Sequence, residues 1–336
     1  MELKTLCELN GASGDERLVR KAILEAAKKL CDDVQIDRMG NVLAFKKGTD
    51  GAKHDKICLS AHMDEVGFII VGATDDGLLR FKPVGGIDPR VVVSKHVKLG
   101  EAALDGVIGA MAIHLQTPEM RARVLTFDEL YIDIGAKTKD EALEKCPPAT
   151  YAYFASSYQK LGGAFVTAKA LDDRVGCYNL LRLMEGAYKA DVTFAFVTQE
   201  EVGLRGAKGA AFKVDPDVAI ILEGTASGDM GDAPKTRTVC NAGGGVAVSF
   251  MDNASIADKG LFKAMLALAE INGVAHQVKR GVTGGNDAAS YQRAKAGART
   301  VVLSVPCRYI HGPSSVASIN DVDAQYSLTK AYLENA

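Results

Sequence analysis

The chain has 336 residues, of which 47% are hydrophobic and 24% are charged, and its formal net charge is -2. This length exceeds the size at which one hydrophobic core usually stops growing, so we expect two domains. The 40 basic and 42 acidic residues form no long run of one sign, which excludes the basic footprint that nucleic acids or anionic membranes require.

The first predicted helix begins at a capping box. Ser13 would be its N-cap and Glu16 the partner three residues on, and apolar residues follow at helical spacing over 19–30. Two short strands, at 34–36 and 42–45, come next and are joined by a turn.

From residue 57 onward, short apolar runs alternate with helical stretches. The runs predict strands at 57–61, 192–197, 218–222, 246–250 and 301–305, and helical spacing predicts helices at 174–188, 261–271, 288–294 and 322–333. Buried strands alternating with helices indicate an α/β domain whose largely parallel sheet is covered on both faces.

Residues 68–162 interrupt this alternation. Their Gly-, Asp- and Val-rich stretches are typical of short strands and tight turns. We therefore expect a catalytic domain formed by residues 1–67 and 163–336, with a small β-rich domain, 68–162, inserted into it.

Polar residues that can bind metals follow five of the apolar runs. Because ligands of open α/β sheets bind at the carboxyl ends of the strands, we expect these residues to converge. They are His62 and Asp64, Asp172 and Asp173, Glu200 and Glu201, Glu223, and His311. Histidines and carboxylates without a thiolate suit zinc, cobalt or manganese.

Each of these residues also has an ordinary structural interpretation. Asp172 and Asp173 could simply cap the next helix, and Glu200 and Glu201 could be a solvated acidic pair. Glu223 is harder to explain in this way, because it follows three apolar residues and a buried carboxylate needs a partner. The coincidence at five successive strand ends favours a metal site.

The remaining features indicate an intracellular protein. The seven cysteines are scattered and form no C-x-x-C pair, which is typical of free thiols in the reducing cytoplasm. We expect no secretory signal, and no apolar run approaches the ~20 residues of a membrane-spanning helix.

Several segments resemble those of the tetrahedral (TET-type) dimetal aminopeptidases, a family that includes glutamyl and deblocking aminopeptidases. The similarity runs in order through nearly the whole chain. The segments are 37–41, 61–67, 85–90, 131–136, 169–174, 199–207 and 308–311. The resemblance implies a phosphorylase/hydrolase-like mixed sheet with helices on both faces and a small inserted β-barrel domain.

The resemblance also implies the role of each site residue. Two divalent metal ions per subunit would share Asp172 as a bridging carboxylate. The expected metals are zinc or cobalt in the first place and manganese in the second. His62 and Glu223 would complete one site, and Glu201 and His311 the other. Glu200 would be the general base, Asp64 would orient His62, and a cis peptide bond would follow Asp172.

The implied activity is removal of N-terminal residues from peptides by a homo-oligomer, from a dimer to a dodecamer, that acts on neither nucleic acid nor membranes. Alternatives are a dimetal carboxypeptidase or amidase of the same fold, a metal-free carbohydrate hydrolase, and a catalytically silent scaffold. The chain departs from the family pattern at Glu223, where Asp is common, at Asn286, where Thr is frequent, and at residues 312–315. The sequence leaves open the preferred N-terminal residue and the group that binds the substrate amine.

Overall fold

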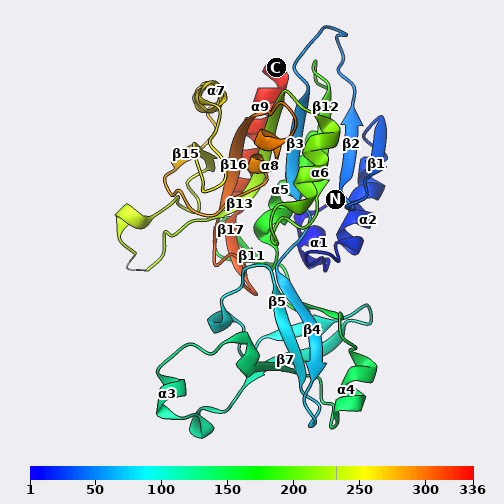
Figure 1. Ribbon diagram of the computed structural model, residues 1–336. Helices are drawn as coiled ribbons and strands as arrows, with labels where there is room; N and C mark the ends of the chain where they lie inside the picture. The colour runs from blue at the N-terminus through cyan, green and yellow to red at the C-terminus, as the bar shows by residue number, and fades with distance from the viewer. Residues whose placement is uncertain (232) are drawn as a thin grey trace.

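The computed structural model describes residues 1–231 and 233–336. Most strands belong to one large mixed sheet, and six others form a separate barrel (Figure 1). Both chain termini lie in the part that contains the large sheet. The predicted α/β fold with a mixed sheet and an inserted β-barrel is confirmed.

Four parallel strands form the centre of the large sheet. In spatial order they are β12 (Val192–Val197), β3 (Ile57–His62), β13 (Val218–Ala226) and β16 (Arg299–Arg308). Their carboxyl ends therefore meet at the same edge of the sheet. Each strand is almost wholly buried, which explains why the sequence shows continuous apolar runs rather than alternation.

Most of the outer strands are antiparallel to their neighbours, which makes the sheet mixed. Antiparallel β2 (Val42–Lys46) and β1 (Asp33–Ile36) extend it beyond β12. On the other side lie β17 (Ser315–Ser318), β11 (Phe165–Ala168) and β10 (Gln159–Lys160), while β14 (Val246–Ser249) pairs with β16 and with parallel β15 (His276–Lys279).

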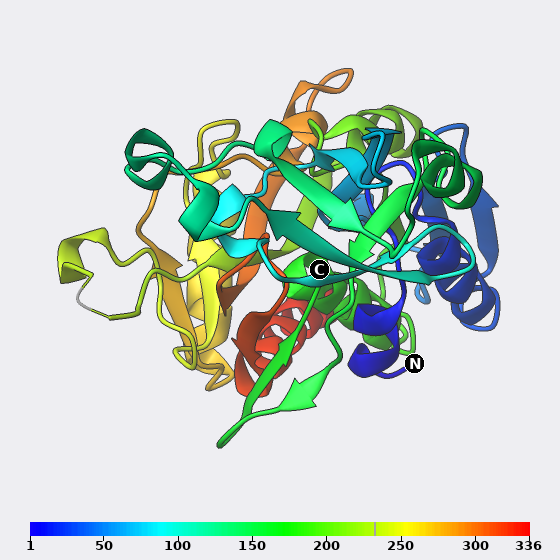
Figure 2. The same cartoon turned by 90° about the horizontal axis from the view of Figure 1, so that it is seen from below.

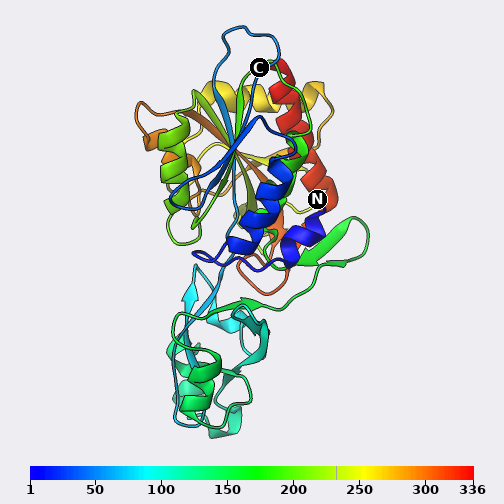
Figure 3. The same cartoon turned by 90° about the vertical axis from the view of Figure 1, so that its right-hand side faces the viewer.

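Helices cover both faces of this sheet (Figure 3). Buried residues of α2 (Arg17–Ala27), α5 (Leu171–Leu183), α7 (Lys259–Ile271) and α9 (Ile319–Asn335) share one apolar cluster with the strands. On the opposite face, α6 (Arg205–Val214) and α8 (Ala288–Arg293) pack with small residues against a second cluster. The short helix α1 (Leu3–Glu8) contributes Leu3 and Cys7 to a further cluster with β11 and β17.

The barrel lies below the large sheet in Figure 1, on the side where β3 ends, and it is in front of the sheet in the view from below (Figure 2). Around the barrel, the strands run in the order β4 (Gly67–Ala73), β5 (Leu79–Val84), β8 (Leu130–Asp133), β7 (Leu104–Ala110), β6 (His96–Leu99) and β9 (Tyr151–Phe154). Phe68 packs edge-on against Phe81 and Phe154, with ring centroids 5.2 Å apart in each pair, and these rings help to fill an apolar core separate from that of the sheet.

The remaining elements are short. They are α3 (Pro118–Arg121), α4 (Lys139–Lys145) and the 3₁₀ turns Pro89–Val91, Ile113–Leu115, Phe127–Glu129 and Lys235–Arg237. Two of them contribute to the barrel core, α4 through Ala142 and a 3₁₀ turn through Phe127. No helix in the described part of the chain is long and apolar enough to cross a membrane.

The predicted capping box at Ser13 is wrong. Helix α2 begins only at Arg17, and the Ser13 hydroxyl donates instead to Asp64 Oδ2 at 2.6 Å. Glu16 accepts hydrogen bonds from the backbone N–H groups of Gly14 and Gln199. The buried Asp64 carboxylate, which is distant in sequence, therefore competes successfully for the hydroxyl that the local pattern assigns to a cap.

Candidate metal centre

The parallel strands bring the predicted ligands to one pocket of about 450 Å³ at the sheet edge. These residues belong to five strands or to the segments that follow them. His62 is the last residue of β3, and Glu223 lies within β13. Glu200 and Glu201 follow β12, His311 follows β16, and Asp172 follows β11. Asp64 does not line this pocket but is fully buried behind it. Strand β13 continues three residues past Glu223, so this carboxylate projects from the strand and not from its end.

Two histidines face opposite oxygens of one carboxylate. His62 Nε2 lies 3.5 Å from Asp172 Oδ1 and 3.6 Å from Glu223 Oε2. His311 Nε2 lies 3.7 Å from Asp172 Oδ2 and 3.2 Å from Glu201 Oε2. Asp172 thus stands between two groups of ligand atoms, each with one histidine and one glutamate.

The hydrogen bonding of these carboxylates fits a bound cation. Asp172 Oδ1 and Glu223 Oε1 are buried and have no hydrogen-bond partner among the described residues. A buried carboxylate without a partner is costly, and a divalent cation would supply one. The imidazole and carboxylate donors suit zinc, cobalt or manganese.

Asp173 could compete with Asp172 as a ligand. Ligand atoms of His62, Asp173 and Glu223 lie within 4.8 Å of one another, as do those of His62, Asp172 and Glu201. However, the Asp173 carboxylate already accepts hydrogen bonds from the backbone N–H groups of His62 and Gly176, at 3.2 and 3.1 Å. Asp172 therefore has the free lone pairs, while Asp173 binds the first turn of the following helix.

The backbone at these two residues agrees with the resemblance. The peptide bond between Asp172 and Asp173 is cis, as expected. Neither residue has helical dihedral angles, so the regular part of α5 begins at Arg174.

The electrostatics of the pocket favour positive charge. Burial lowers the pKa of His311, but contacts with Asp172 and Glu201 outweigh it and raise the value to about 11. The pKa of His62 is also raised well above its ordinary value, because Asp172 and Asp64 outweigh the effect of burial. Burial raises the pKa of the Glu223 carboxyl well above its usual range. A bound metal would relieve the same excess of negative charge.

Nearly the whole chain is similar to known proteins. Residues 40–328 match the family described as M42 glutamyl aminopeptidase. This chain belongs to the M42 family. It is 31% identical over 341 residues to the lysyl aminopeptidase of Pyrococcus furiosus, an alignment that covers 99% of this chain and 96% of that protein.

Solved structures of M42-like aminopeptidases superpose closely on this fold. An aminopeptidase from the archaeon Desulfurococcus kamchatkensis has a TM-score of 0.94 at 32% identity and covers 99% of this chain and 94% of its own. The TET1 peptidase of Pyrococcus horikoshii has a TM-score of 0.87 at 35% identity. The superposition covers 99% of this chain and 98% of the TET1 chain. The present M42 chain is accordingly a metallo-aminopeptidase, a hydrolase of peptides.

Asp64 organises both sides of the M42 site. His62 Nδ1 donates to the backbone carbonyl of Asp64 at 3.0 Å, which leaves Nε2 free to face the carboxylates. The Asp64 carboxylate lies 3.5 Å from the same Nδ1 and accepts the backbone N–H groups of Glu200 and Glu201, at 3.0 and 3.1 Å. One buried carboxylate therefore fixes the histidine and the pair of glutamates together.

A buried ion cluster holds the loops beneath the site. Lys169 Nζ lies 2.6 Å from Glu65 Oε1, and Arg174 Nη2 lies 3.5 Å from the same oxygen. Arg174 also donates to the backbone carbonyls of Met63 and Leu9. The cluster ties the segment after β3 to the start of α5, and so sets His62 relative to Asp172.

Sequence reasoning missed two ionisable residues near the site. Lys279, the last residue of β15, lines the pocket although its side chain is mostly buried. Asp287 is fully buried directly before α8, neither of its carboxylate oxygens has a hydrogen-bond partner among the described residues, and burial raises its pKa to about 7. Asn286 accepts the backbone N–H of Ala288 at 3.0 Å, so the α8 start forms with Asn at this position. The one available signal was the unusual Gly-Gly-Asn-Asp segment, 284–287.

We expect His62→Ala and Asp172→Ala each to lower the amount of bound metal, because each removes a donor from the carboxylate-rich pocket. Metal content would be measured by atomic emission on dialysed protein. His96→Ala, which changes an exposed histidine of the barrel, is the matched control and should leave the content unchanged. Full metal occupancy in both site variants would exclude them as ligands.

Proposed function

We propose that the chain removes N-terminal residues from peptides with a dinuclear metal centre and a glutamate base. The observation that carries this proposal is that the two oxygens of Asp172 face different histidines, which is the arrangement expected of a bridging ligand. One ion would be held by His62, Asp172 and Glu223, and the other by Asp172, Glu201 and His311.

Glu200 is suited to act as the general base. It lines the pocket beside Glu201, and burial raises the pKa of its carboxyl well above the ordinary value. When bound, the two ions would supply an acidified water and stabilise negative charge on the carbonyl oxygen. Glu200 would accept the proton of that water and return it to the leaving amine, a task for which a raised pKa is favourable.

Glu200→Gln should retain bound metal and reduce kcat by roughly 100-fold or more, because an amide cannot accept the proton. Hydrolysis of an aminoacyl p-nitroanilide would be measured with zinc, cobalt and manganese after chelation. The same preparation would be assayed for metal by atomic emission. A variant that keeps more than a few per cent of the wild-type kcat would remove Glu200 from this role.

The pocket also supports a preference for an acidic N-terminal residue. Lys279 is 7% exposed and lines the pocket, and its ammonium forms no hydrogen bond or ion pair with the described residues. The acidic groups that line the same pocket are the proposed ligands and base. Lys279 would thus be free to pair with a substrate carboxylate. The names of relatives do not decide the preference, since they include a lysyl aminopeptidase and a glutamyl aminopeptidase from Lactococcus lactis.

Lys279→Met should lower kcat/KM for glutamyl p-nitroanilide by about 10- to 100-fold, the effect of losing a hydrogen-bonded charge pair. The leucyl substrate should change little, because its side chain carries no charge. The ratio of the two kcat/KM values is the measurement. An unchanged ratio would show that Lys279 does not contact the substrate side chain.

We further propose that residues 68–162 assemble the chain into a homo-oligomer. Among the large apolar residues that are exposed, several belong to this insertion; they include Val71, Met111, Ile113, Leu115 and Val124. Such exposed apolar surface is typical of interfaces. The related TET1 peptidase of Pyrococcus horikoshii can assemble into a tetrahedron or a large octahedral shell.

The purified chain should sediment at several times its monomer mass of 35.6 kDa. Ile113→Asp with Leu115→Asp should reduce that mass, because both side chains are at least 65% exposed in the single chain and would lose their apolar partners. Ile271→Asp, at an 80% exposed position on α7, is the control and should not change the mass. A wild-type monomer at micromolar concentration contradicts the proposal.

A cytoplasmic location completes the proposed function. Its support is the scattered arrangement of the seven cysteines, all of which are free thiols.

A further inference from the structure

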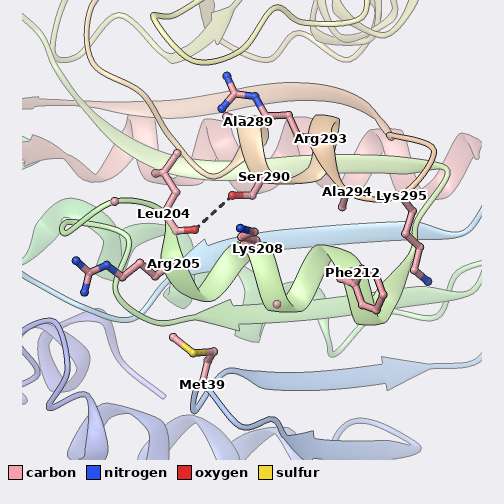
Figure 4. Close-up of a pocket in the computed structure, with 12 residues that line it drawn as sticks. Met39, Leu204, Arg205, Lys208, Phe212, Ala289, Ser290, Arg293, Ala294 and Lys295 are labelled. Carbon is pink, nitrogen blue, oxygen red and sulfur yellow. Dashed lines mark hydrogen bonds between the residues drawn. The ribbon is translucent and has the colours of Figure 1, made fainter.

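A second, larger pocket lies beside the candidate metal centre. It is a groove of about 840 Å³ that runs over α6, with α8 on one side of this helix and Met39 on the other (Figure 4). Leu204, three residues after Glu201, lines both this groove and the pocket of the metal centre. The groove and the pocket of the metal centre therefore adjoin at Leu204.

The groove is basic. Its charged lining residues are Arg205, Lys208, Arg293 and Lys295, all exposed, and no carboxylate lines it. Lys295 pairs with Asp215 at 3.2 Å, whereas the other three cations form no ion pair with the described residues. In a chain with slightly more acidic than basic residues, four cations without a lining carboxylate mark a site for an anionic ligand.

The groove also offers apolar contacts. Phe212 is 63% exposed and lies beneath the Lys295 ammonium, which is 4.8 Å from the ring centroid. Met39, 39% exposed, also lines the groove, on the side of α6 away from α8 (Figure 4). An extended peptide presents this combination of an uncharged backbone, apolar side chains and a carboxylate.

We propose that this groove binds the part of the peptide substrate that follows the scissile bond, and that its cations pair with the C-terminal carboxylate or with acidic side chains there. The proposal rests on the proposed function, because it needs the peptide N-terminus at the metal centre. To the proposed activity it adds a preference for peptide substrates that are long enough to reach the cations of the groove.

The length of α6 determines how many peptide residues are needed to extend along the groove. Its ten residues span about 15 Å, at 1.5 Å per residue. An extended peptide rises about 3.3 Å per residue, so four to five residues cover the groove. Together with the residues at the metal centre, a peptide of about six to eight residues extends past the cations, which are spread along α6 from Arg205 to the contact between Lys295 and Phe212. An aminoacyl anilide ends at the metal centre and does not extend along the groove.

The test compares two octapeptides of identical neutral sequence, one with a free C-terminal carboxylate and one with a C-terminal amide. An aminoacyl p-nitroanilide with the same first residue is the short reference substrate. The wild-type enzyme should show a kcat/KM about three- to tenfold higher for the free acid, as expected for a few exposed ion pairs. Lys208→Glu with Arg293→Glu should bring this ratio to one or below, while activity on the anilide stays unchanged.

Matched variants and a mass measurement separate the outcomes. Lys263→Glu, an exposed lysine of α7 on the opposite face, should keep the wild-type ratio. The milder Lys208→Ala with Arg293→Ala should lower the ratio without introducing new charge. A ratio of one in the wild-type enzyme, or a wild-type ratio retained in both double variants, overturns the proposal.

Light scattering gives a further readout. If the double variants lose assembly mass and keep the acid-to-amide ratio, the groove is a contact between copies of the chain and the proposal is wrong. If the wild-type enzyme hydrolyses neither octapeptide nor the anilide, the proposed aminopeptidase function fails instead, which is a distinguishable result.

Discussion

The structure depends on the concentration of buried negative charge at one edge of its sheet. Four carboxylates that line the pocket surround two imidazoles, and two of their buried oxygens lack hydrogen-bond partners in the described structure. Carboxylates at such a density repel one another unless a cation lies between them. This repulsion arises because the carboxyl ends of the parallel strands converge. A bound metal ion would reduce it.

The groups behind the pocket keep this charge in place. Asp64, in the segment after β3, accepts hydrogen bonds from the loop that follows β12, and Ser13 adds another from the N-terminal segment. Glu65, Lys169 and Arg174 form a buried ion cluster of one anion and two cations, so it adds no further excess of negative charge beneath the centre. Separate chain segments are thus fixed to one another through polar contacts at the site.

Much of this arrangement could be predicted from the sequence. Continuous apolar runs that end in His or Glu place those side chains at a common edge as soon as the strands are parallel, so His62, Glu201 and His311 could be grouped without coordinates. Ser13 was misassigned because a local cap pattern says nothing about Asp64, which lies 51 residues away. Lys279 was missed because its position depends on the pairing of β15 with β14, and periodicity carries no information about which strands pair.

The barrel contributes a backbone contact to the metal centre. The carbonyl of Gly86, in the loop after β5, accepts a hydrogen bond from His311 Nδ1 at 2.9 Å, and this bond leaves Nε2 facing Asp172 and Glu201. The tautomer and orientation of one imidazole are therefore set from outside the sheet. A rigid-body rotation of the barrel would turn that imidazole away from the carboxylates, so a force applied to the barrel by neighbouring molecules would be transmitted mechanically to the catalytic pocket.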